Sequence, residues 1–155
     1  ICLRPFNTFG PYQSERAIIP ELIIKCLRGE EVKTTDGLQT REFNFVDNII
    51  DGFILAGEIS EIPKTSINIG AGEEVVIKDL IKKIHKLTNS SSKLSIGALK
   101  IRPTEIWRMR AENKKAKTIL GWTSSVPFER GLIHTIKWFK SFIELYFSDV
   151  GLRRL

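Results

Sequence analysis

Three short segments of the sequence each place a polar or charged side chain beside residues that restrict the backbone. In the first, residues 4–11, two prolines and a glycine restrict a loop that follows the apolar residues 1–3. Open α/β sheets bind ligands at the carboxyl ends of strands, and an Asn there can donate two hydrogen bonds to a phosphate or sugar oxygen. Asn7 is therefore a candidate ligand-binding residue, although an Asn at this position also suits a purely structural turn.

The second segment, residues 40–47, carries an arginine among large apolar residues at the start of an expected strand. The planar guanidinium of Arg41 suits a pyrophosphate, because it can form two parallel hydrogen bonds to phosphate oxygens. An ion pair of Arg41 with Glu42 or Asp47 is the alternative interpretation, and the two interpretations are compatible.

The third segment, residues 102–105, combines a second arginine with a carboxylate. Arg102 could bind a phosphate, while Glu105, three positions later, could accept hydrogen bonds from a pair of ribose hydroxyls. Without further context, an ion pair at the surface is an equally good interpretation of this segment.

The elements expected to position these segments are short strands mixed with longer helices, which predicts the α/β fold class. Strands are expected at 1–4, 43–46, 66–69 and 94–96, and helices at 18–27, after Asp47, at 76–87, at 112–120 and from about 127 onward. The Asp36-Gly37 pair interrupts residues 32–40 and predicts a hairpin-like turn. The helix after Asp47 is expected to bury an apolar stripe formed by Ile49, Ile50, Phe53, Ile54 and Leu55.

Composition narrows the classes of partner. The net charge of +6 fits either a nucleic-acid-binding surface or a solvated face with a few cations for a small anionic ligand. The basic residues are scattered along helical stretches without interleaved aromatics, which favours the second interpretation. Cys2, Cys26, His85 and His134 lack the spacing of metal ligands, so we expect structural thiols in a reducing compartment and no metal. No apolar run approaches the roughly 20 residues that span a bilayer, so no membrane partner is expected.

In order and spacing, these segments resemble those of the extended short-chain dehydrogenases that act on nucleotide sugars, a family of NAD-dependent 4-epimerases, 4,6-dehydratases and their relatives. Residues 4–11 are similar to the family's Arg-x-x-Asn-x-Tyr-Gly-Pro, residues 41–47 to Arg-Asp-Phe-x-x-Val-x-Asp, and residues 66–72 to Asn-x-Gly-x-Gly. Residues 17–20, 102–103, 111–117 and 120–122 complete the series. The resemblance extends from Leu3 to about Lys140, with Phe9 and Glu42 standing where the family has Tyr and Asp.

The resemblance implies the C-terminal portion of an extended short-chain dehydrogenase (Rossmann-like) fold, with a small mixed α/β substrate domain. The substrate-binding region would cover residues 1–147, and residues 148–155 would be a frayed tail. Arg41 and Arg102 would clamp the two phosphates of a nucleoside-diphosphate sugar, and Asn7 would bind its pyrophosphate or sugar. The other implied roles are ribose binding by Glu105, nucleotide-pocket lining by Ile18 and Ile19, a position near the base for Thr34 and Thr35, and approach to the nicotinamide of NAD by Pro5 and Phe6.

Two motifs of that family are missing from the sequence, the Gly-rich NAD fingerprint and the catalytic Tyr-x-x-x-Lys pair. The triplet 70–72 (Gly-Ala-Gly) lacks the third glycine and is expected to form a tight turn whose amides open a helix, with direct phosphate contact as the alternative. Tyr12 and Tyr146 are followed four positions later by Arg16 and Val150, so neither forms the pair. In the family both motifs lie upstream of the strand with which this sequence begins. We therefore expect a fragment without catalytic residues, inactive alone, whose NAD would be bound mainly by a missing part.

Residues 4–20 are most similar to the 4,6-dehydratases, in particular those acting on N-acetylhexosamine nucleotides on the way to nonulosonic surface sugars. The functional hypothesis is a cytoplasmic, NAD-dependent nucleotide-sugar 4,6-dehydratase for surface polysaccharide sugars, with a 4-epimerase or a non-catalytic truncated binding module as alternatives. The family's C-terminal strands complete its nucleotide-binding sheet. The chain alone is therefore expected to expose residues 1–3 and 67–69 at an apolar edge, and to form a homodimer or be marginally stable.

Overall fold

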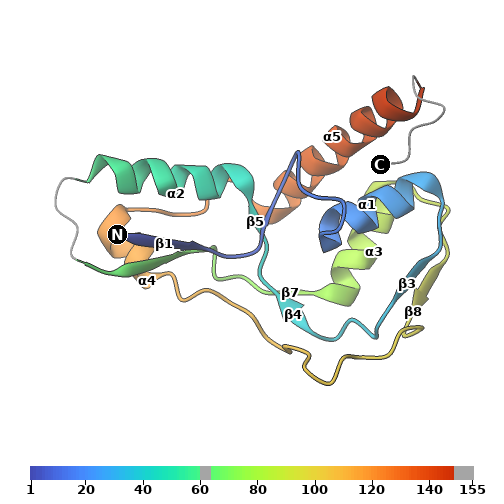
Figure 1. The fold of residues 1–155 in the computed structure, drawn as a ribbon, viewed down its shortest axis with the longest axis horizontal. Coiled ribbons are helices and arrows are strands. Elements are labelled where there is room, and N and C mark those ends of the chain that lie inside the picture. Colours follow the sequence, from blue (N-terminus) through green and yellow to red (C-terminus); the bar gives the residue numbers. More distant parts are fainter. Residues whose placement is uncertain (60–63, 149–155) are drawn as a thin grey trace.

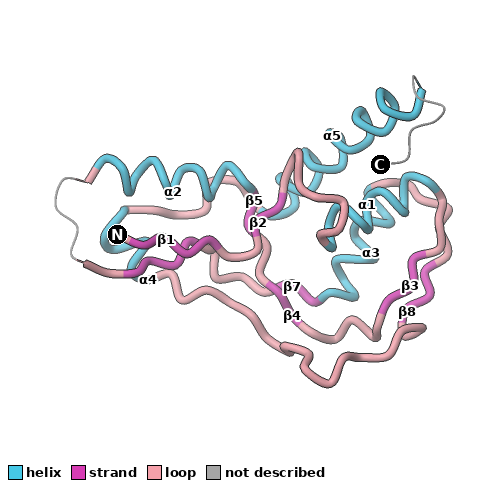
Figure 2. Tube along the Cα trace, viewed as in Figure 1, coloured by secondary structure: helices cyan, strands magenta, loops and turns pink. Residues whose placement is uncertain are grey.

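The computed structural model describes residues 1–59 and 64–148 as an elongated molecule (Figure 1). The elements, in chain order, are β1 (Cys2–Pro5), β2 (Thr8–Phe9), α1 (Ile18–Arg28), β3 (Val32–Thr34), β4 (Thr40–Arg41), β5 (Asn44–Phe45), α2 (Val46–Glu58), β6 (Ser66–Ile69), β7 (Val75–Val76), α3 (Ile77–Leu87), β8 (Leu94–Ile96), α4 (Lys114–Leu120) and α5 (Phe128–Ser148). One end of the molecule holds β1, α2 and α4, and the other holds α1, α3, β3 and β8 (Figure 1). Long loops cross between the two ends (Figure 2).

The end that holds α1, α3, β3 and β8, together with the adjoining part of α5, is here called the helical end. In α3 the apolar residues recur at helical spacing, so Leu80, Ile81 and Ile84 all face inward and are almost fully buried. The helix α1 buries Ile23 in the same way and ends at Gly29, which adopts the left-handed conformation (φ 68°) that glycine tolerates best. The buried core continues into β2, β5 and α5 through Phe9, Phe45, Leu132 and Phe139.

The other end, here called the strand end, consists of β1, β6, α2 and α4. β1 and β6 pair in parallel, with Cys2 opposite Ser66 and Pro5 opposite Ile69. Its core is small and is formed by Ile49, Ala56, Ile67, Ile69, Ala116, Leu120 and Trp122. Ile67 and Ile69 are fully buried, so the expected exposure of residues 67–69 is wrong. α2 and α4 cover these side chains, and at Gly52 the helix α2 comes so close that a Cβ atom would lie 3.0 Å from Ile69 Cγ2.

The hairpin predicted around Asp36-Gly37 does not form. β3 pairs in parallel with β8, whereas β4 pairs antiparallel with β7, so the two arms of the expected hairpin have different partners. Gly37 (φ 68°) lies against the first turn of α3, and its carbonyl accepts a hydrogen bond of 2.8 Å from Lys78 N. The glycine is needed because a Cβ atom there would lie 2.9 Å from Lys78 N, so the turn docks on a helix and does not fold back on itself.

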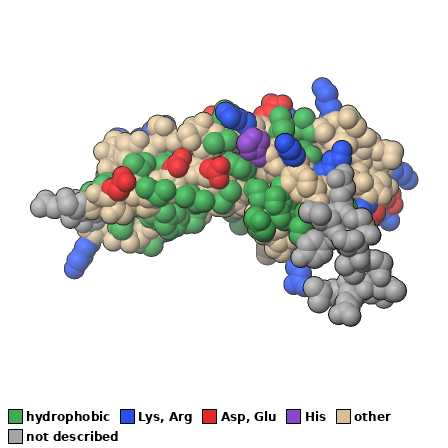
Figure 3. Space-filling model, turned by 90° about the horizontal axis from the view of Figure 1, so that it is seen from above, with side chains coloured by type: hydrophobic (Ala, Val, Ile, Leu, Met, Phe, Trp, Pro, Cys, Tyr) green, Lys and Arg blue, Asp and Glu red, His purple; other side chains and the backbone are tan. Residues whose placement is uncertain are grey.

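The apolar stripe predicted for α2 is only partly buried. Ile49 is buried, whereas Ile50, Phe53 and Ile54 are each about half exposed, at 49%, 51% and 53%. Apolar side chains gather on this part of the surface, interspersed with acidic ones, when the molecule is viewed from above (Figure 3). The prediction of a single buried face was wrong because α2 has apolar residues on two faces, and Gly52 and Ala56 lie on the face that packs.

The last helix, α5, begins at Phe128 and confirms the helix expected from about residue 127. Residues 149–155, most of the predicted frayed tail, lie outside the described residues. None of the helices in the described part of the chain is long and apolar enough to span a membrane. Within residues 1–59 and 64–148, no cluster of three or more His, Cys, Asp or Glu side chains is placed to hold a metal ion.

Candidate functional site

A pocket of about 490 Å³ opens on the helical end, between the start of α1, the loop around β2 and the strand β4. Its fourth wall is the loop of residues 99–113, here called the arm, which belongs to the connection that runs from β8 to α4 (Figure 1). The lining residues are Asn7, Thr8, Phe9, Gln13, Ala17, Ile18, Ile19, Gln39, Arg41, Phe43, Ile77, Arg102 and Glu105. Six of the predicted substrate-binding residues therefore meet in one cavity: Asn7, Ile18, Ile19, Arg41, Arg102 and Glu105.

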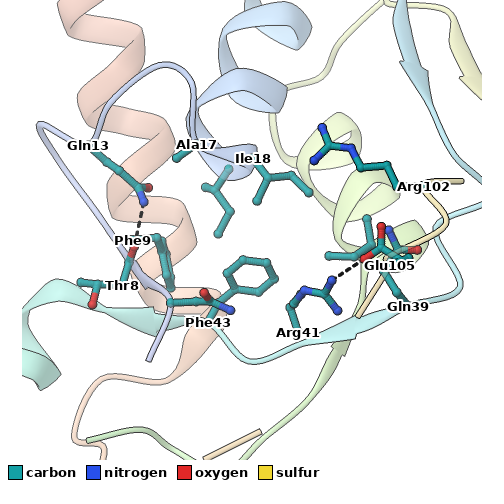
Figure 4. A pocket seen from close by; sticks show the side chains of 13 residues that line it. Thr8, Phe9, Gln13, Ala17, Ile18, Gln39, Arg41, Phe43, Arg102 and Glu105 are labelled. Carbon is teal, nitrogen blue, oxygen red and sulfur yellow. Dashed lines mark hydrogen bonds and ion pairs between the residues drawn. The ribbon is translucent and has the colours of Figure 1, made fainter. Parts of the chain in front are cut away.

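Arg41 projects into the pocket from β4, and both of its terminal nitrogens have partners (Figure 4). Its Nη1 donates to the Thr40 carbonyl at 2.8 Å, and its Nη2 donates to Glu105 Oε1 at 2.5 Å. The Arg41 and Glu105 side chains are only 17% and 16% exposed. The arginine thus forms an ion pair, but with a residue of the arm and with neither Glu42 nor Asp47.

The two guanidiniums of the pocket differ in their surroundings. Arg102 reaches toward the cavity from the arm and is exposed (Figure 4). Within the described part of the chain its guanidinium makes no hydrogen bond or ion pair, so the predicted alternative of an Arg102–Glu105 surface pair does not form. The backbone N–H of Glu105 instead donates to the Arg102 carbonyl, in a turn that brings both side chains to the same pocket.

Glu42 lies in sequence between the pocket residues Arg41 and Phe43, and its own side chain is fully buried. Its Oε2 accepts a hydrogen bond from Ala111 N, and its Oε1 accepts from Gly72 N and from the Asn44 side chain. Three donors to one carboxylate offset its loss of water, and they tie the arm to the turn at residues 70–72. A Cβ atom at Gly70 would collide with the Glu42 carboxylate, which explains the glycine there.

The turn at residues 70–72 uses its amides within the protein. Ala71 N donates to Asn44 Oδ1 at 2.8 Å and Gly72 N donates to Glu42 Oε1 at 3.1 Å. The turn is followed by β7 and only then by α3, so its amides do not open a helix as predicted. The alternative of direct phosphate contact is also disfavoured, because these two N–H groups already have acceptors.

Residues 107–111 of the arm are held by β4 and by the residues around it. Thr40 N donates to the Trp107 carbonyl at 2.9 Å and Glu42 N donates to the Met109 carbonyl at 3.0 Å. Arg108 forms a bidentate ion pair with Glu74, with contacts from 2.6 to 3.1 Å. The hydrogen bonds from Arg108 and then from Thr40 lower the pKa of the Glu74 carboxyl from 4.5 to about 2. These contacts hold Arg102 and Glu105 over the pocket.

The loop around β2 supplies another wall of the pocket. Asn7 lines the pocket, its carbonyl accepts from Asn44 N at 2.9 Å, and its side-chain amide lies 3.5 Å from Met109 Sδ. Sulfur is a weak acceptor, so the Asn7 amide remains available to a ligand. Gly10 lets the loop approach α2, since a Cβ atom there would lie 2.7 Å from Val46 Cγ1.

The other predicted residues lie beside the pocket. Thr34 and Thr35 line a neighbouring hollow of about 190 Å³, which shares Ile18, Gln39 and Ile77 with the main cavity. Pro5 and Phe6 do not line either cavity. Pro5 ends β1 opposite Ile69, and the N–H of Phe6, the next residue, donates to the Ile69 carbonyl at 3.0 Å. The structure therefore brings the residues assigned to phosphates and ribose together and separates those assigned to NAD from them.

Several residues that line the pocket were not predicted from the sequence. Gln39, Arg41 and Phe43 alternate along an extended segment, so the period of two that places Arg41 in the pocket could also have identified its neighbours. Gln13 carried no comparable signal. Its Nε2 donates to the Thr8 carbonyl at 2.7 Å, while its buried Oε1 accepts no hydrogen bond within the described residues, so a ligand hydroxyl or amide could donate to it.

Comparison with known proteins places this geometry in a family. Residues 1–135 match the sequence profile of the family described as GDP-mannose 4,6 dehydratase. The chain is similar to UDP-glucuronic acid decarboxylase 1 of Xenopus tropicalis, with 30% identity over 144 residues, 91% of this chain and 33% of that protein. It is also similar to human dTDP-D-glucose 4,6-dehydratase, with 28% identity over 152 residues, 90% of this chain and 41% of that protein.

Solved structures agree with this assignment. UDP-glucose 4-epimerase of Thermotoga maritima, determined with UDP-glucose, superposes with a TM-score of 0.84 at 27% identity, over 92% of this chain and 46% of that one. UDP-glucuronic acid 4-epimerase of Bacillus cereus, determined with UDP-glucuronic acid and NAD, gives a TM-score of 0.82 at 31% identity, over 90% of this chain and 45% of that one. The chain thus spans less than half the length of these relatives.

These likenesses define the class of protein: the chain has the fold of the C-terminal portion of an extended short-chain dehydrogenase, as the sequence predicted. It belongs to the GDP-mannose 4,6-dehydratase family, and its relatives are NAD-dependent dehydratases, decarboxylases and epimerases of nucleotide sugars.

Proposed function

We propose that the chain binds a nucleoside-diphosphate sugar in the pocket, as the substrate-binding part of an NAD-dependent nucleotide-sugar 4,6-dehydratase. The observation that carries the proposal is the meeting of Arg41, Arg102 and Glu105 in one cavity of about 490 Å³. Arg41 comes from β4, and the other two residues come from the arm. Arg41 and Glu105 are 64 positions apart in the sequence. Two guanidiniums and a carboxylate are the groups that a diphosphate and a ribose require.

The apolar wall of the pocket would orient the ligand. Ile18, Phe43 and Ile77 provide surface for the flat nucleoside, and the smaller hollow beside them, lined by Thr34 and Thr35, would receive the base. Asn7 and Gln13 lie on another wall, formed by the β2 loop, and each has hydrogen-bonding capacity to spare for a phosphate or a sugar hydroxyl. The diphosphate would then span Arg41 and Arg102, with the sugar directed toward Asn7.

Pro5 and Phe6 fit an approach to NAD, because they lie where two parallel strands end, the side of a sheet on which ligands bind. When bound, NAD would accept and return a hydride at the sugar. Residues of the pocket would position the sugar for that exchange, by holding its diphosphate at Arg41. Since the sequence lacks a Tyr-x-x-x-Lys pair, the chain alone is expected to bind substrate without turning it over.

Each of two alternative functions is supported by one particular observation. A nucleotide-sugar 4-epimerase is favoured by the superposition on epimerases crystallised with UDP sugars. A non-catalytic binding module is favoured by the missing catalytic pair. Within the whole protein, the dehydratase proposal predicts a product that has lost one water, detected by mass spectrometry of the nucleotide sugar; a product of unchanged mass would favour the epimerase. The proposed dehydratase would act in the synthesis of surface polysaccharide sugars.

Titration calorimetry with UDP-glucose and UDP tests the binding proposal. Arg41→Ala should weaken both ligands by about 1.5–3 kcal/mol, roughly 10- to 150-fold, because a charge-assisted contact to phosphate is lost. Arg130→Ala, which removes an exposed arginine of α5, is the matched control and should bind as the unaltered chain does. Equal affinity of Arg41→Ala and the unaltered chain would refute the phosphate role of Arg41.

A further inference from the structure

The turn between β2 and α1 carries a tyrosine where the backbone favours a glycine. Gln13 N donates to the Gly10 carbonyl at 3.4 Å, which closes the four-residue turn 10–13. Pro11 occupies the second position of this turn and Tyr12, with a φ of 62°, occupies the third. A proline followed by a residue with positive φ is typical of a type II turn, whose third position is normally Gly or Asn. A tyrosine there costs conformational free energy, because its Cβ atom crowds the backbone.

The ring of Tyr12 is held by an aromatic contact outside the pocket. It packs on Trp138 of α5, with the two ring centroids 4.7 Å apart. Trp138 in turn packs edge-on against Phe139, which is almost fully buried in the core of the helical end. Tyr12 is otherwise 85% exposed, so burial in the core does not explain its conformation. Contacts between aromatic rings are favourable beyond the area they bury, and the contact with Trp138 therefore offsets part of the cost of the turn.

The same turn sets the direction of the next side chain. Tyr12 lies against α5 and does not line the pocket, whereas Gln13 does (Figure 4). The Nε2 of Gln13 is fixed by its hydrogen bond of 2.7 Å to the Thr8 carbonyl. Its Oε1 is buried and accepts no hydrogen bond within the described residues, so it is placed to receive one from a ligand. The orientation of this amide thus depends on a turn that is held from outside the cavity.

We propose that Tyr12 is a positioning residue. Docked on Trp138, it holds the turn 10–13 in the form that presents Gln13 Oε1 to a hydroxyl or N–H group of the bound nucleotide sugar. The inference rests on the proposed function and extends its site to a residue outside the cavity. Without the aromatic contact, the turn would populate other conformations. The ligand would then bind only the fraction of molecules with the turn in place, and its apparent affinity would fall in proportion to that fraction.

Two substitutions in the full 155-residue chain separate the ring from the backbone. Tyr12→Gly removes an exposed ring and relieves a strained backbone, so the melting temperature should change little. Its affinity for UDP-glucose in titration calorimetry should nevertheless fall about fivefold, as expected if roughly a fifth of the molecules keep the turn in place. Tyr12→Phe keeps the ring and should restore the original affinity. A purely structural role would instead make affinity and thermal stability change together.

Asn89→Gly is the matched control for the change to glycine. In the described part of the chain, Asn89 is the other non-glycine residue with positive φ (48°), and it does not line the pocket. This variant should bind UDP-glucose as the unaltered chain does.

A second comparison tests whether Tyr12 acts through Gln13. In a Gln13→Ala background, Tyr12→Gly should lower the affinity for UDP-glucose by less than about twofold, since the contact that Tyr12 supports is already gone. A full fivefold loss in that background would overturn the inference.

The remaining outcomes also decide it. If Tyr12→Gly binds UDP-glucose as tightly as the unaltered chain while Arg41→Ala still weakens binding, the inference fails and the nucleotide site stands. An equal loss in Tyr12→Gly and Tyr12→Phe would assign the effect to the hydroxyl, and a similar loss in Asn89→Gly would make it nonspecific; either result contradicts a role for the ring. If the unaltered chain does not bind UDP-glucose, the proposed function fails, and this inference fails with it.

Discussion

The two ends of the molecule enclose their apolar cores to different extents. The helical end surrounds its core on several sides, with α1, α3 and α5 contributing side chains such as Ile23, Leu80 and Leu132 that are fully buried. The strand end has two parallel strands and two helices, and its small core is centred on Trp122. Parallel strands normally lie within larger sheets covered on both faces. The comparison shows that the candidate pocket lies on the end whose core is enclosed by three helices, while the strand end presents apolar surface that another element could cover.

The unused surface of the strand end is the outer face of α2. Ile50, Phe53 and Ile54 are each about half exposed there. Exposed apolar patches of this kind mark sites of association. The expected homodimer, or a further part of a longer protein, would cover this face and leave the pocket open, because the pocket lies on the helical end.

The largest effects are expected from truncating one core side chain at each end. Trp122→Ala should cost about 3–5 kcal/mol and Leu80→Ala about 2–5 kcal/mol, since both leave a cavity in a packed core. If the two ends are separable, hydrogen exchange in Trp122→Ala should rise in α2 and β6 while α1 and α3 stay protected. Leu80→Ala should raise exchange around the pocket and weaken UDP. Equal loss of protection at both ends in both variants would show that the molecule unfolds as one unit.

An intermediate effect is expected at the arm, which joins the two ends. Glu74→Gln removes the bidentate partner of Arg108 and should weaken UDP several-fold by loosening the arm. The pKa of Glu74 is lowered to about 2 in the folded chain, so the ion pair contributes stability above a pH near 4.5, and this contribution is lost as pH falls toward about 2. Thermal melting of Glu74→Gln and of the unaltered chain should therefore converge over that range. Curves that stay equally far apart down to pH 2 would contradict the assignment.

The smallest effect on stability is expected at the outer face of α2. Phe53→Gln should change the free energy of unfolding by only about 0.5 kcal/mol, because the side chain is half exposed. It should reduce self-association in sedimentation velocity experiments if α2 forms the contact between two copies. Ile133→Gln, at an equally exposed position of α5, is the matched control and should leave the sedimentation coefficient unchanged. Identical association of Phe53→Gln and the unaltered chain would remove α2 from the interface.

Much of this architecture could be predicted from local sequence patterns. The helices α1, α3 and α5 follow from the spacing of their apolar residues, and the pocket contains Asn7, Arg41 and Arg102 as the ordered motifs indicated. The failures concern contacts between distant parts of the chain. Glu105, the partner of Arg41, lies 64 positions away along the chain, so neighbours in sequence such as Glu42 looked like better partners. Likewise, Asp36-Gly37 has the composition of a hairpin turn, and only the presence of α3 beside it decides otherwise.

The pairing of the arm with β4 also has a consequence for the order of folding. Thr40 and Trp107 are 67 positions apart, and the link from Ala111 to Glu42 closes a loop of 69. Closing such loops costs chain entropy before any contact repays it, and the packing of α1 on α3 spans a similar separation, so the walls of the pocket cannot meet by local folding alone. In a chain emerging from the ribosome, Arg41 would meet Glu105 only after the arm had been synthesised. The candidate site is therefore expected to mature well after the strand that supplies Arg41 has been made.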